Sequence, residues 1–319
     1  MSITYYLLQY RLNQISKLIS IYRDHGNYTL LITIINHLYI ELVRKLNFPL
    51  KLTFNLQHGS GMEIMDEDWD NLIILDACRY DIFKNHSKFK NQNVEKKVSQ
   101  GSWTLEFIKS NFVGKSFHDT VYVTSNVFSN IIPERTFHNI IPLYAQEDGS
   151  KPQHVAQAAL KAHVEYPNKR LLIHFMQPHI PHLTELGQKY GKHIFHAAMN
   201  GKISHKELEN SYIENLDIVE KHCELLLNEL QGKTVITSDH GENLGESGFY
   251  SDGTHATKFG FNIPLYGHGF QTEECRLVPW CVIDNYKNRK NIEPSEPVSR
   301  EAVNKEKMTE NLKTLGYLK

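Results

Sequence analysis

The chain has 319 residues, of which 40% are hydrophobic and 22% are charged, and its formal net charge is −1. This balance is that of an ordinary globular protein with one large domain or two smaller ones, and it argues against a nucleic-acid partner. The 18 histidines are many for this length, which favours a metal site or proton-transfer chemistry. The four cysteines contain no CxxC pair, so a thiolate zinc site of the usual spacing is absent.

The first 60 residues are predicted to form a helical N-terminal extension. Apolar residues recur there at helical spacing, at Leu8, Leu12, Ile15 and Ile19. The same stretch holds six lysines and arginines against only Asp24 and Glu41. A basic amphipathic helix can lie on an anionic membrane surface. Two interpretations stay open, namely peripheral membrane contact through residues 1–60, and a helical hairpin packed on the rest of the chain or on a partner.

No stretch has the composition of a membrane span. The most apolar window, residues 28–43, contains Asn36, His37 and Glu41, whereas a span needs about 20 mostly apolar residues. The start of the chain also lacks the basic region and unbroken apolar core of a signal peptide. The sequence therefore predicts a cytoplasmic protein with free thiols, located at the inner membrane surface if the extension binds lipid.

From about residue 65 onward, buried strands alternate with helices. Strands are predicted at residues 71–77, 121–124, 170–176, 234–237 and 277–283. Helices are predicted to begin at residue 79, to cover residues 152–166 and 211–230, and to run from residue 299 to 316. The alternation predicts an α/β domain, in which ligands bind at the carboxyl ends of the strands.

Three of these strands lead into groups that can bind a metal or transfer a proton. The first ends at Asp76, the strand at 170–176 leads to His179 and His182, and the strand TVITS leads to Asp239 and His240. Carboxylate oxygens suit Mg²⁺, Mn²⁺ or Ca²⁺, and an added imidazole moves the preference toward Mn²⁺ or Zn²⁺. The alternative for Asp-His-Gly after a strand is a turn, with the carboxylate bonded to local backbone N–H groups.

The segment GSWTLEFIKSNFVG places hydroxyl groups at a predicted helix start. Backbone N–H groups and the helix dipole favour an anion there, and a metal would activate the hydroxyl. Thr104 is the candidate nucleophile and Ser102 is its rival. The alternative is that one of the two caps the helix, with Glu106 following.

Taken together, these segments resemble the alkaline phosphatase superfamily, within it the sulfatase-like and phosphoglycerol-transferase-like branch. The similar segments follow the family's order and are LIILDACRYD, GSWTLEFIKSNFVG, HFMQPHIPH, TSDHGENLGE, YGHGF with CRLVPWCVI, and ENLKTLGYLK. The resemblance covers roughly residues 70–319, and residues 1–60 have no counterpart in it. It implies a catalytic domain at residues 65–319, built as a three-layer α/β/α sandwich around a mostly parallel sheet.

The resemblance also implies roles for individual residues. It implies one divalent metal (Mn, Zn, Mg or Ca), whose ligands would be Asp76, Thr104, Asp239 and His240. It implies that His179 holds a substrate oxygen or protonates the leaving group, and that His268 does likewise or binds a second metal. Two-metal members need a further Asp with two histidines, and the sequence shows no clear Asp for that set.

Three more residues are candidates for binding the substrate. Arg79 follows Asp76 closely enough to hold a phosphate with both arms of its guanidinium, or it pairs with Asp81 or Glu106. Lys258 is a second anion contact, or a solvated loop lysine. His182 follows His179 in the same segment.

The nucleophile segment indicates which esters are attacked. The chain lacks the Cys-x-Pro-x-Arg pattern of the main sulfatases, and Cys78 lies in the predicted turn after the first strand. Thr104 in its place indicates a metal-dependent hydrolase or transferase of phosphorus esters, with a small-molecule, lipid-linked or polysaccharide substrate. The alternatives are a sulfatase that works without formylglycine, and a binding protein on the same fold that has lost catalysis.

Overall fold

The computed structural model describes residues 47–144, 146, 148–247, 264–283 and 288–298. The chain divides into two compact units, residues 1–51 and residues 52–319. Most of the predicted extension therefore lies outside the described residues, as do Lys258 and the predicted C-terminal helix. The described end of the extension is helical, because α2 covers Asn47–His58. The assignment of separate roles to an extension and a catalytic domain stays a prediction.

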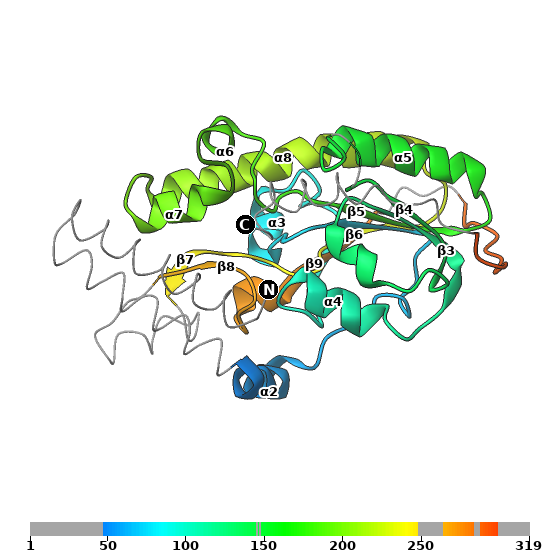
Figure 1. Cartoon of the computed structure of the whole chain (residues 1–319), viewed down its shortest axis with the longest axis horizontal. Helices are drawn as coiled ribbons and strands as arrows, with labels where there is room; N and C mark the ends of the chain where they lie inside the picture. Colours follow the sequence, from blue (N-terminus) through cyan, green and yellow to red (C-terminus); the bar gives the residue numbers. More distant parts are fainter. Residues whose placement is uncertain (1–46, 145, 147, 248–263, 284–287, 299–319) are drawn as a thin grey trace, which may run out of the picture. The chain divides into compact units, whose positions relative to one another are not determined.

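The described residues contain a seven-stranded sheet with the order β2-β9-β6-β1-β5-β3-β4 (Figure 1). Its strands are β1 (Asn71–Leu75), β2 (Asn93–Val98), β3 (Phe117–Thr124), β4 (Phe137–Pro142), β5 (Arg170–Phe175), β6 (Thr234–Thr237) and β9 (Leu277–Val282). The five strands from β6 to β4 run parallel, and β9 is antiparallel to both of its neighbours. A separate two-stranded antiparallel sheet pairs β7 (Asn243–Ser247) with β8 (Pro264–Gly267).

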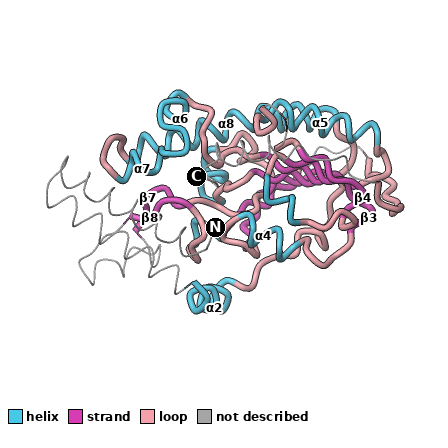
Figure 2. Tube along the Cα trace, in the orientation of Figure 1, coloured by secondary structure: helices cyan, strands magenta, loops and turns pink. Residues whose placement is uncertain are grey.

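Helices cover both faces of the seven-stranded sheet. The α-helices that follow α2 are α3 (Tyr80–His86), α4 (Thr104–Asn111), α5 (Pro152–Glu165), α6 (Glu185–Tyr190), α7 (Ile194–Met199), α8 (His205–Glu229) and α9 (Glu273–Arg276). Two short 3-10 helices are η1 (Val127–Ile131) and η2 (Gly191–His193). Helices α5 and α8 lie along one face of the strands and α4 lies against the other (Figure 2). The predicted three-layer arrangement around a mostly parallel sheet is therefore confirmed.

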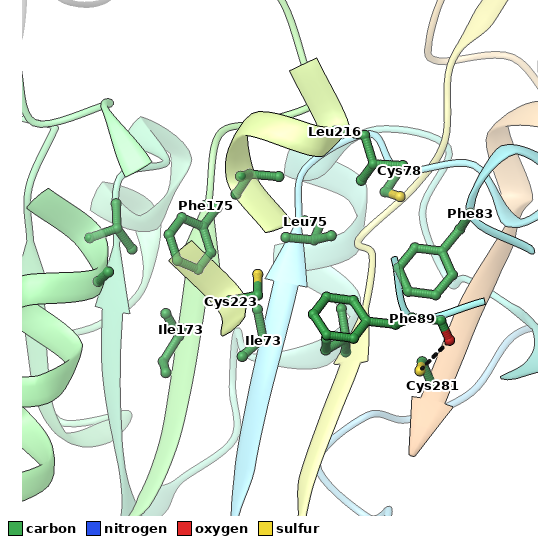
Figure 3. Close-up of a cluster of buried hydrophobic side chains, with 14 of the residues drawn as sticks. Ile73, Leu75, Cys78, Phe83, Phe89, Ile173, Phe175, Leu216, Cys223 and Cys281 are labelled. Atoms are coloured by element: carbon green, nitrogen blue, oxygen red, sulfur yellow. Dashed lines mark hydrogen bonds between the residues drawn. The ribbon is translucent and has the colours of Figure 1, made fainter. Parts of the chain in front are cut away.

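The alternation of side chains along the central strands explains the two cores. Ile73 and Leu75 of β1 point into a cluster with α5 and α8, whereas Leu72 and Ile74 point into a second cluster with α4. Figure 3 shows the first cluster, with Ile73 and Leu75 close to Cys223 of α8. All five residues of β1 are buried, as expected for a strand covered on both faces.

Helix α8 is longer than its apolar pattern predicts. It begins at His205 rather than at residue 211, because Ser204 and Glu207 form a capping box that satisfies the first turn. The buried stripe of this helix runs from Leu208 to Leu226 and packs into the first cluster. The helix thereby carries Tyr212 to the turn that follows β1, where its hydroxyl donates a hydrogen bond to the Ala77 carbonyl at 2.6 Å.

Helix α8 also carries a buried carboxyl group, that of Glu220. The Ser87 hydroxyl donates to its Oε1, and the Lys88 backbone N–H donates to its Oε2 at 3.0 Å. Burial raises the pKa of Glu220 to about 7. The folded protein therefore favours the protonated form, and the contribution of this group to stability is present below pH 4.5 and lost as the pH rises through 7.

We expect Glu220→Gln to stabilise the protein at pH 8 relative to the wild type, because the uncharged amide can accept from the Lys88 N–H with its oxygen and donate to Ser87 Oγ with its nitrogen. The pKa difference corresponds to about 3 kcal/mol at most. The measurement is the thermal unfolding midpoint of both proteins from pH 5 to pH 8. Glu224→Gln, one turn further along α8 and half exposed beside Lys88, is the control. Parallel curves for Glu220→Gln and the wild type would contradict the expectation.

Candidate metal centre

The carboxyl ends of β1 and β6 are held together by two side chains that directly follow β6, those of Ser238 and Asp239. Asp76 follows β1 directly, and Ala77 next to it has φ of +62°, an uncommon conformation for a residue with a side chain. The Ala77 N–H donates to Asp239 Oδ1 at 3.1 Å, and the Cys78 N–H donates to Ser238 Oγ at 2.8 Å. These bonds hold the two aspartates beside each other at the edge of the sheet.

His240 presents its Nε2 atom to both aspartates. Its Nδ1 lies 2.8 Å from the Gly241 carbonyl oxygen, so the ring proton resides on Nδ1 and donates to that oxygen. The Nε2 lone pair then lies 3.5 Å from Asp76 Oδ1 and 3.5 Å from Asp239 Oδ2. An imidazole fixed in this tautomer by a backbone carbonyl is prepared to bind a metal.

Thr104 is the first residue of α4, and its side chain completes the cluster. Its Oγ1 lies 3.2 Å from His240 Nε2 and 3.4 Å from Asp76 Oδ2. The Ser102 hydroxyl is used elsewhere, because it donates to Glu106 at 2.9 Å and accepts from the Gln271 amide at 3.1 Å. Of the two candidate hydroxyls, only that of Thr104 therefore lies against the aspartates and His240.

The residues present fit a divalent cation. Asp76 Oδ1 and Asp239 Oδ2 are buried and have no hydrogen-bond partner among the described residues. One ligand atom each from Asp76, Asp239 and His240 lie within 4.8 Å of one another. Burial, and then the Asp239 charge, raises the pKa of Asp76, and burial raises the pKa of Asp239. A cation would remove this cost, and the mixed oxygen and imidazole set favours Mn²⁺ or Zn²⁺.

A second cluster adjoins the first and consists of His179, Glu242 and His268, with ligand atoms within 4.8 Å of one another. His268 Nδ1 lies 2.9 Å from Glu242 Oε1, and the ring centroids of His268 and His240 are 4.7 Å apart. Glu242 supplies the carboxylate that the sequence did not identify. The signal was present, because Glu242 closes the Ser-Asp-His-Gly-Glu motif that contains Asp239.

The two histidines of the second cluster have pKa values shifted in opposite directions. Burial lowers the pKa of His268, but the Glu242 charge and hydrogen bond outweigh it, so that the pKa is raised. His179 behaves differently, because burial, His268 and His240 hold its pKa well below the usual value. The cluster can thus hold a proton on His268 or, with neutral imidazoles, a second cation.

Asn126 is a site residue that the sequence did not identify. Its Nδ2 donates to Asp76 Oδ2 at 2.6 Å and reaches Thr104 Oγ1 at 3.4 Å. Its Oδ1 accepts from the Phe128 N–H at 2.9 Å and so caps η1. The only local signal is a polar residue shortly after the strand that ends at Thr124. An asparagine in that place is usual in a turn.

Two predicted substrate contacts are not placed for that role. The Arg79 guanidinium is nearly buried and pairs with Asp81 at 2.7 Å and with Glu246 of β7. It also donates to the Glu242 carbonyl oxygen at 3.4 Å, so it holds the motif loop rather than a substrate. Arg79 is thus paired with Asp81, as the alternative in the sequence analysis expected, with both arms of the guanidinium in use, and its contact with the substrate stays a prediction.

His182 is likewise directed into the protein. Its Nδ1 lies 2.9 Å from Ser211 Oγ of α8, and burial lowers its pKa to about 4. It belongs to neither cluster of metal-binding side chains, and its predicted contact with the substrate finds no support in this position. Lys258 lies outside the described residues, so its predicted role stays a prediction.

Comparison with known proteins gives structural matches alone, since no family model and no curated protein sequence matches. The chain is similar to the soluble domain of lipooligosaccharide phosphoethanolamine transferase A from Neisseria meningitidis, with 12% identity and a TM-score of 0.41 over 66% of this chain and 75% of that one. It is also similar to the C-terminal periplasmic domain of a phosphoethanolamine transferase from Campylobacter jejuni, with 12% identity and a TM-score of 0.43 over 67% and 78%.

A third match is the corresponding periplasmic domain from Escherichia coli, in complex with zinc, with 12% identity and a TM-score of 0.39 over 70% of this chain and 75% of that one. These transferases belong to the superfamily that the sequence motifs resemble. Functional arguments for this chain rest on its own residues, because the likeness concerns the fold.

The comparisons contradict the predicted cytoplasmic location, since two of the similar structures are described as periplasmic domains. That prediction is withdrawn. Within the part of the chain that the structure describes, none of the helices combines the length and the apolar character needed to cross a membrane.

We expect the two clusters to bind cations with unequal strength. The first offers two carboxylates and an imidazole, and the second offers one carboxylate and two imidazoles. Asp239→Asn should abolish binding of the more tightly held cation. Glu242→Gln should keep that cation and lose only a second, more weakly bound one. The measurement is metal content by mass spectrometry after dialysis against Zn²⁺ or Mn²⁺ at graded concentrations. Equal metal content in Asp239→Asn and the wild type would rule out the first cluster as a metal site.

Proposed function

We propose that this chain is a metal-dependent enzyme that cleaves or transfers phosphorus esters with Thr104 as its nucleophile. The observation that carries the proposal is the position of the Thr104 hydroxyl, within 3.4 Å of both His240 and Asp76 in a buried cluster. A hydroxyl that served only to cap α4 would face the backbone of its own helix. Here the neighbouring Ser102 forms the local bond to Glu106 instead.

A divalent cation on this cluster would lower the pKa of a hydroxyl and offset negative charge on a phosphoryl oxygen. Asp76, Asp239, His240 and Thr104 are the residues that would hold it. Asn126 donates to Asp76, and the Ala77 N–H donates to Asp239, so one oxygen of each carboxylate is held in place. The other oxygen of each is then left to the cation.

The start of α4 provides the second requirement, a place for the anionic group. Thr104 opens an eight-residue helix, and the backbone N–H groups of a first helical turn point toward a group bound there. The positive end of the helix dipole adds to their effect. The nucleophile and the anion site therefore come from the same turn of the chain.

The proposed reaction has two steps. In the first, the Thr104 hydroxyl loses its proton to solvent, its Oγ forms a bond to phosphorus, the bond from phosphorus to the leaving alcohol breaks, and the departing oxygen takes up a proton. His268 is the candidate donor of that proton, because Glu242 raises its pKa and its ring lies beside His240. In the second step, water or an acceptor alcohol gives a proton to the now neutral His268 and attacks phosphorus, the bond from phosphorus to Thr104 Oγ breaks, and Thr104 Oγ regains a proton from solvent. Water makes the enzyme a hydrolase, and an alcohol makes it a transferase.

The proposed substrate class is supported by the chemistry of the site. A Thr nucleophile suits phosphorus esters, and the similar solved domains are named phosphoethanolamine transferases. We propose a lipid-linked or other small phosphate ester as the donor. Sulfate esters present the same tetrahedral anion, so they remain the alternative. A binding protein without catalysis is the other alternative, and it has no use for a hydroxyl against the metal ligands.

We expect metal-dependent release of p-nitrophenol from a phosphate monoester or diester by the wild type, and loss by Thr104→Ala of about a thousandfold or more. The protein is stripped of metal and reloaded with Mn²⁺, Zn²⁺, Mg²⁺ or Ca²⁺ before the assay, and a sulfate ester is tested in parallel. Ser102→Ala is the matched control, because its hydroxyl lies in the same segment but faces Glu106. It should keep most of the activity.

A phosphodiester or a phosphoethanolamine lipid should also leave a group on Thr104 that intact-mass measurement detects and that Thr104→Ala lacks. Release from the sulfate ester alone would replace the proposal by a sulfatase. Full activity in Thr104→Ala would remove Thr104 as the nucleophile. Metal binding without turnover of any ester, and without a modified Thr104, would favour a binding protein.

A further inference from the structure

His174 lies beneath the two aspartates of the candidate metal centre, and the proposed reaction gives it no role. It is fully buried on β5, and the sheet register places it opposite Ile74 of β1 and Thr124 of β3. Leu172, two residues before it, belongs to the cluster on the α4 face of the sheet, so His174 points to that face as well. Toward the amino ends of the strands this face is apolar, and at their carboxyl ends it carries Asp76 and Asp239.

The groups on either side of His174 indicate which ring nitrogen carries its proton. Tyr122 Oη lies 2.8 Å from His174 Nδ1, and one oxygen each of Asp76 and Asp239 faces Nε2. Carboxylate oxygens attract an N–H group and repel a lone pair, so the arrangement favours a proton on Nε2, with the Tyr122 hydroxyl donating to Nδ1. The ring proton of a neutral His174 then resides on Nε2.

His174 Nε2 faces the two aspartates that would bind the metal. It lies 3.8 Å from Asp239 Oδ2 and 3.9 Å from Asp76 Oδ2, and it is buried without a hydrogen-bond partner among the described residues. These distances exceed a hydrogen bond. The N–H group therefore acts on both oxygens as a dipole at close range, in surroundings that screen it poorly.

We propose that His174 is a positioning residue, which uses an Nε2–H group, with the Tyr122 hydroxyl at Nδ1, to hold Asp76 and Asp239 side by side as metal ligands. The inference rests on the proposed function through its metal centre. Two carboxyl groups buried next to each other need polar partners that fix the positions of their oxygens. The side-chain amide of Asn126 donates to Asp76, and the backbone N–H groups of Ala77 and His240 donate to Asp239. His174 alone, among these donors, lies at nearly equal distance from both.

The proposal separates His174 from a direct metal ligand. A ligand would need the lone pair on Nε2, and hence the proton on Nδ1, where the Tyr122 hydroxyl would have to accept it. The Nε2 lone pair would then face the oxygens of Asp76 and Asp239 without a proton between them. The two arrangements differ in which ring nitrogen carries the proton, and this can be measured.

The test compares four variants of the full chain. His174→Leu removes the donor, and His174→Gln restores an N–H group at nearly the same position. Tyr122→Phe removes the group that fixes the tautomer, and Tyr166→Phe, whose hydroxyl accepts from Asn139 away from the site, is its matched control. Metal affinity is measured by competition with a chelator for Zn²⁺ and for Mn²⁺, and folding by thermal unfolding without metal.

We expect His174→Leu to weaken metal binding by about 10- to 100-fold, the usual effect of losing a group that positions metal ligands. His174→Gln should recover most of this loss, Tyr122→Phe should lose less than His174→Leu, and Tyr166→Phe should match the wild type. Unchanged affinity in His174→Leu would overturn the proposal. Failure of His174→Gln to recover affinity, although it folds, would also overturn it.

A spectroscopic measurement is independent of the mutations. In protein labelled with nitrogen-15 at histidine, the His174 signals, assigned by their loss in His174→Gln, should show a proton on Nε2 before and after addition of Zn²⁺. A Zn²⁺-dependent shift of Nε2 to the value of a coordinated nitrogen would make His174 a ligand and end the positioning role. Both readouts concern metal binding. A wild type that binds metal but turns over no ester would refute the proposed function alone.

Discussion

Two carboxylates buried side by side, those of Asp76 and Asp239, are the constraint on which the rest of the site depends. Ionised carboxylates are costly in a protein interior unless donors or a cation compensate them. The structure surrounds the pair with such donors, namely the backbone N–H groups of Ala77 and His240 and the Asn126 side-chain amide. What the protein leaves unsatisfied is one oxygen of each carboxylate. A cation bound to these two oxygens would offset the charge of the pair.

The sheet makes this juxtaposition possible. Strands β6, β1 and β5 are parallel neighbours, so their carboxyl ends lie at one edge, and residues spaced by two along each strand point to one face. Asp76, Asp239 and His174 share the face covered by α4, whose first residue is Thr104. The apolar cluster of that face, with Leu72, Ile74 and Leu172, supports the site from below. The buried core and the chemical site are therefore two ends of the same surface.

The second cluster extends the site instead of duplicating it. Glu242 and Asp239 stand three residues apart in one loop, which Arg79 holds through Glu246 and the Glu242 carbonyl. The loop thus delivers a carboxylate to each cluster, and His268 joins them through its contact with the ring of His240. The candidate metal ligands of the first cluster, the proposed nucleophile and the candidate proton donor come from four separate segments of the chain. Each segment is short and follows a strand or begins a helix.

The sequence by itself predicted five strands of the sheet (β1, β3, β5, β6 and β9), the α/β architecture and the motifs at the strand ends, because apolar runs and Asp-His-Gly-Glu are local patterns. The strands β2, β4, β7 and β8 were not predicted. It also identified Thr104 and Asp239, although it left Ser102 and a simple turn open as alternatives. Only the tertiary structure decided that Ser102 bonds to Glu106, that Arg79 is used in ion pairs, and that Glu242, Asn126 and His174 belong to the site. These outcomes depend on which strands are neighbours in the sheet and on which face a side chain points. The partners are up to 169 residues apart in the chain, and no local pattern records such pairings.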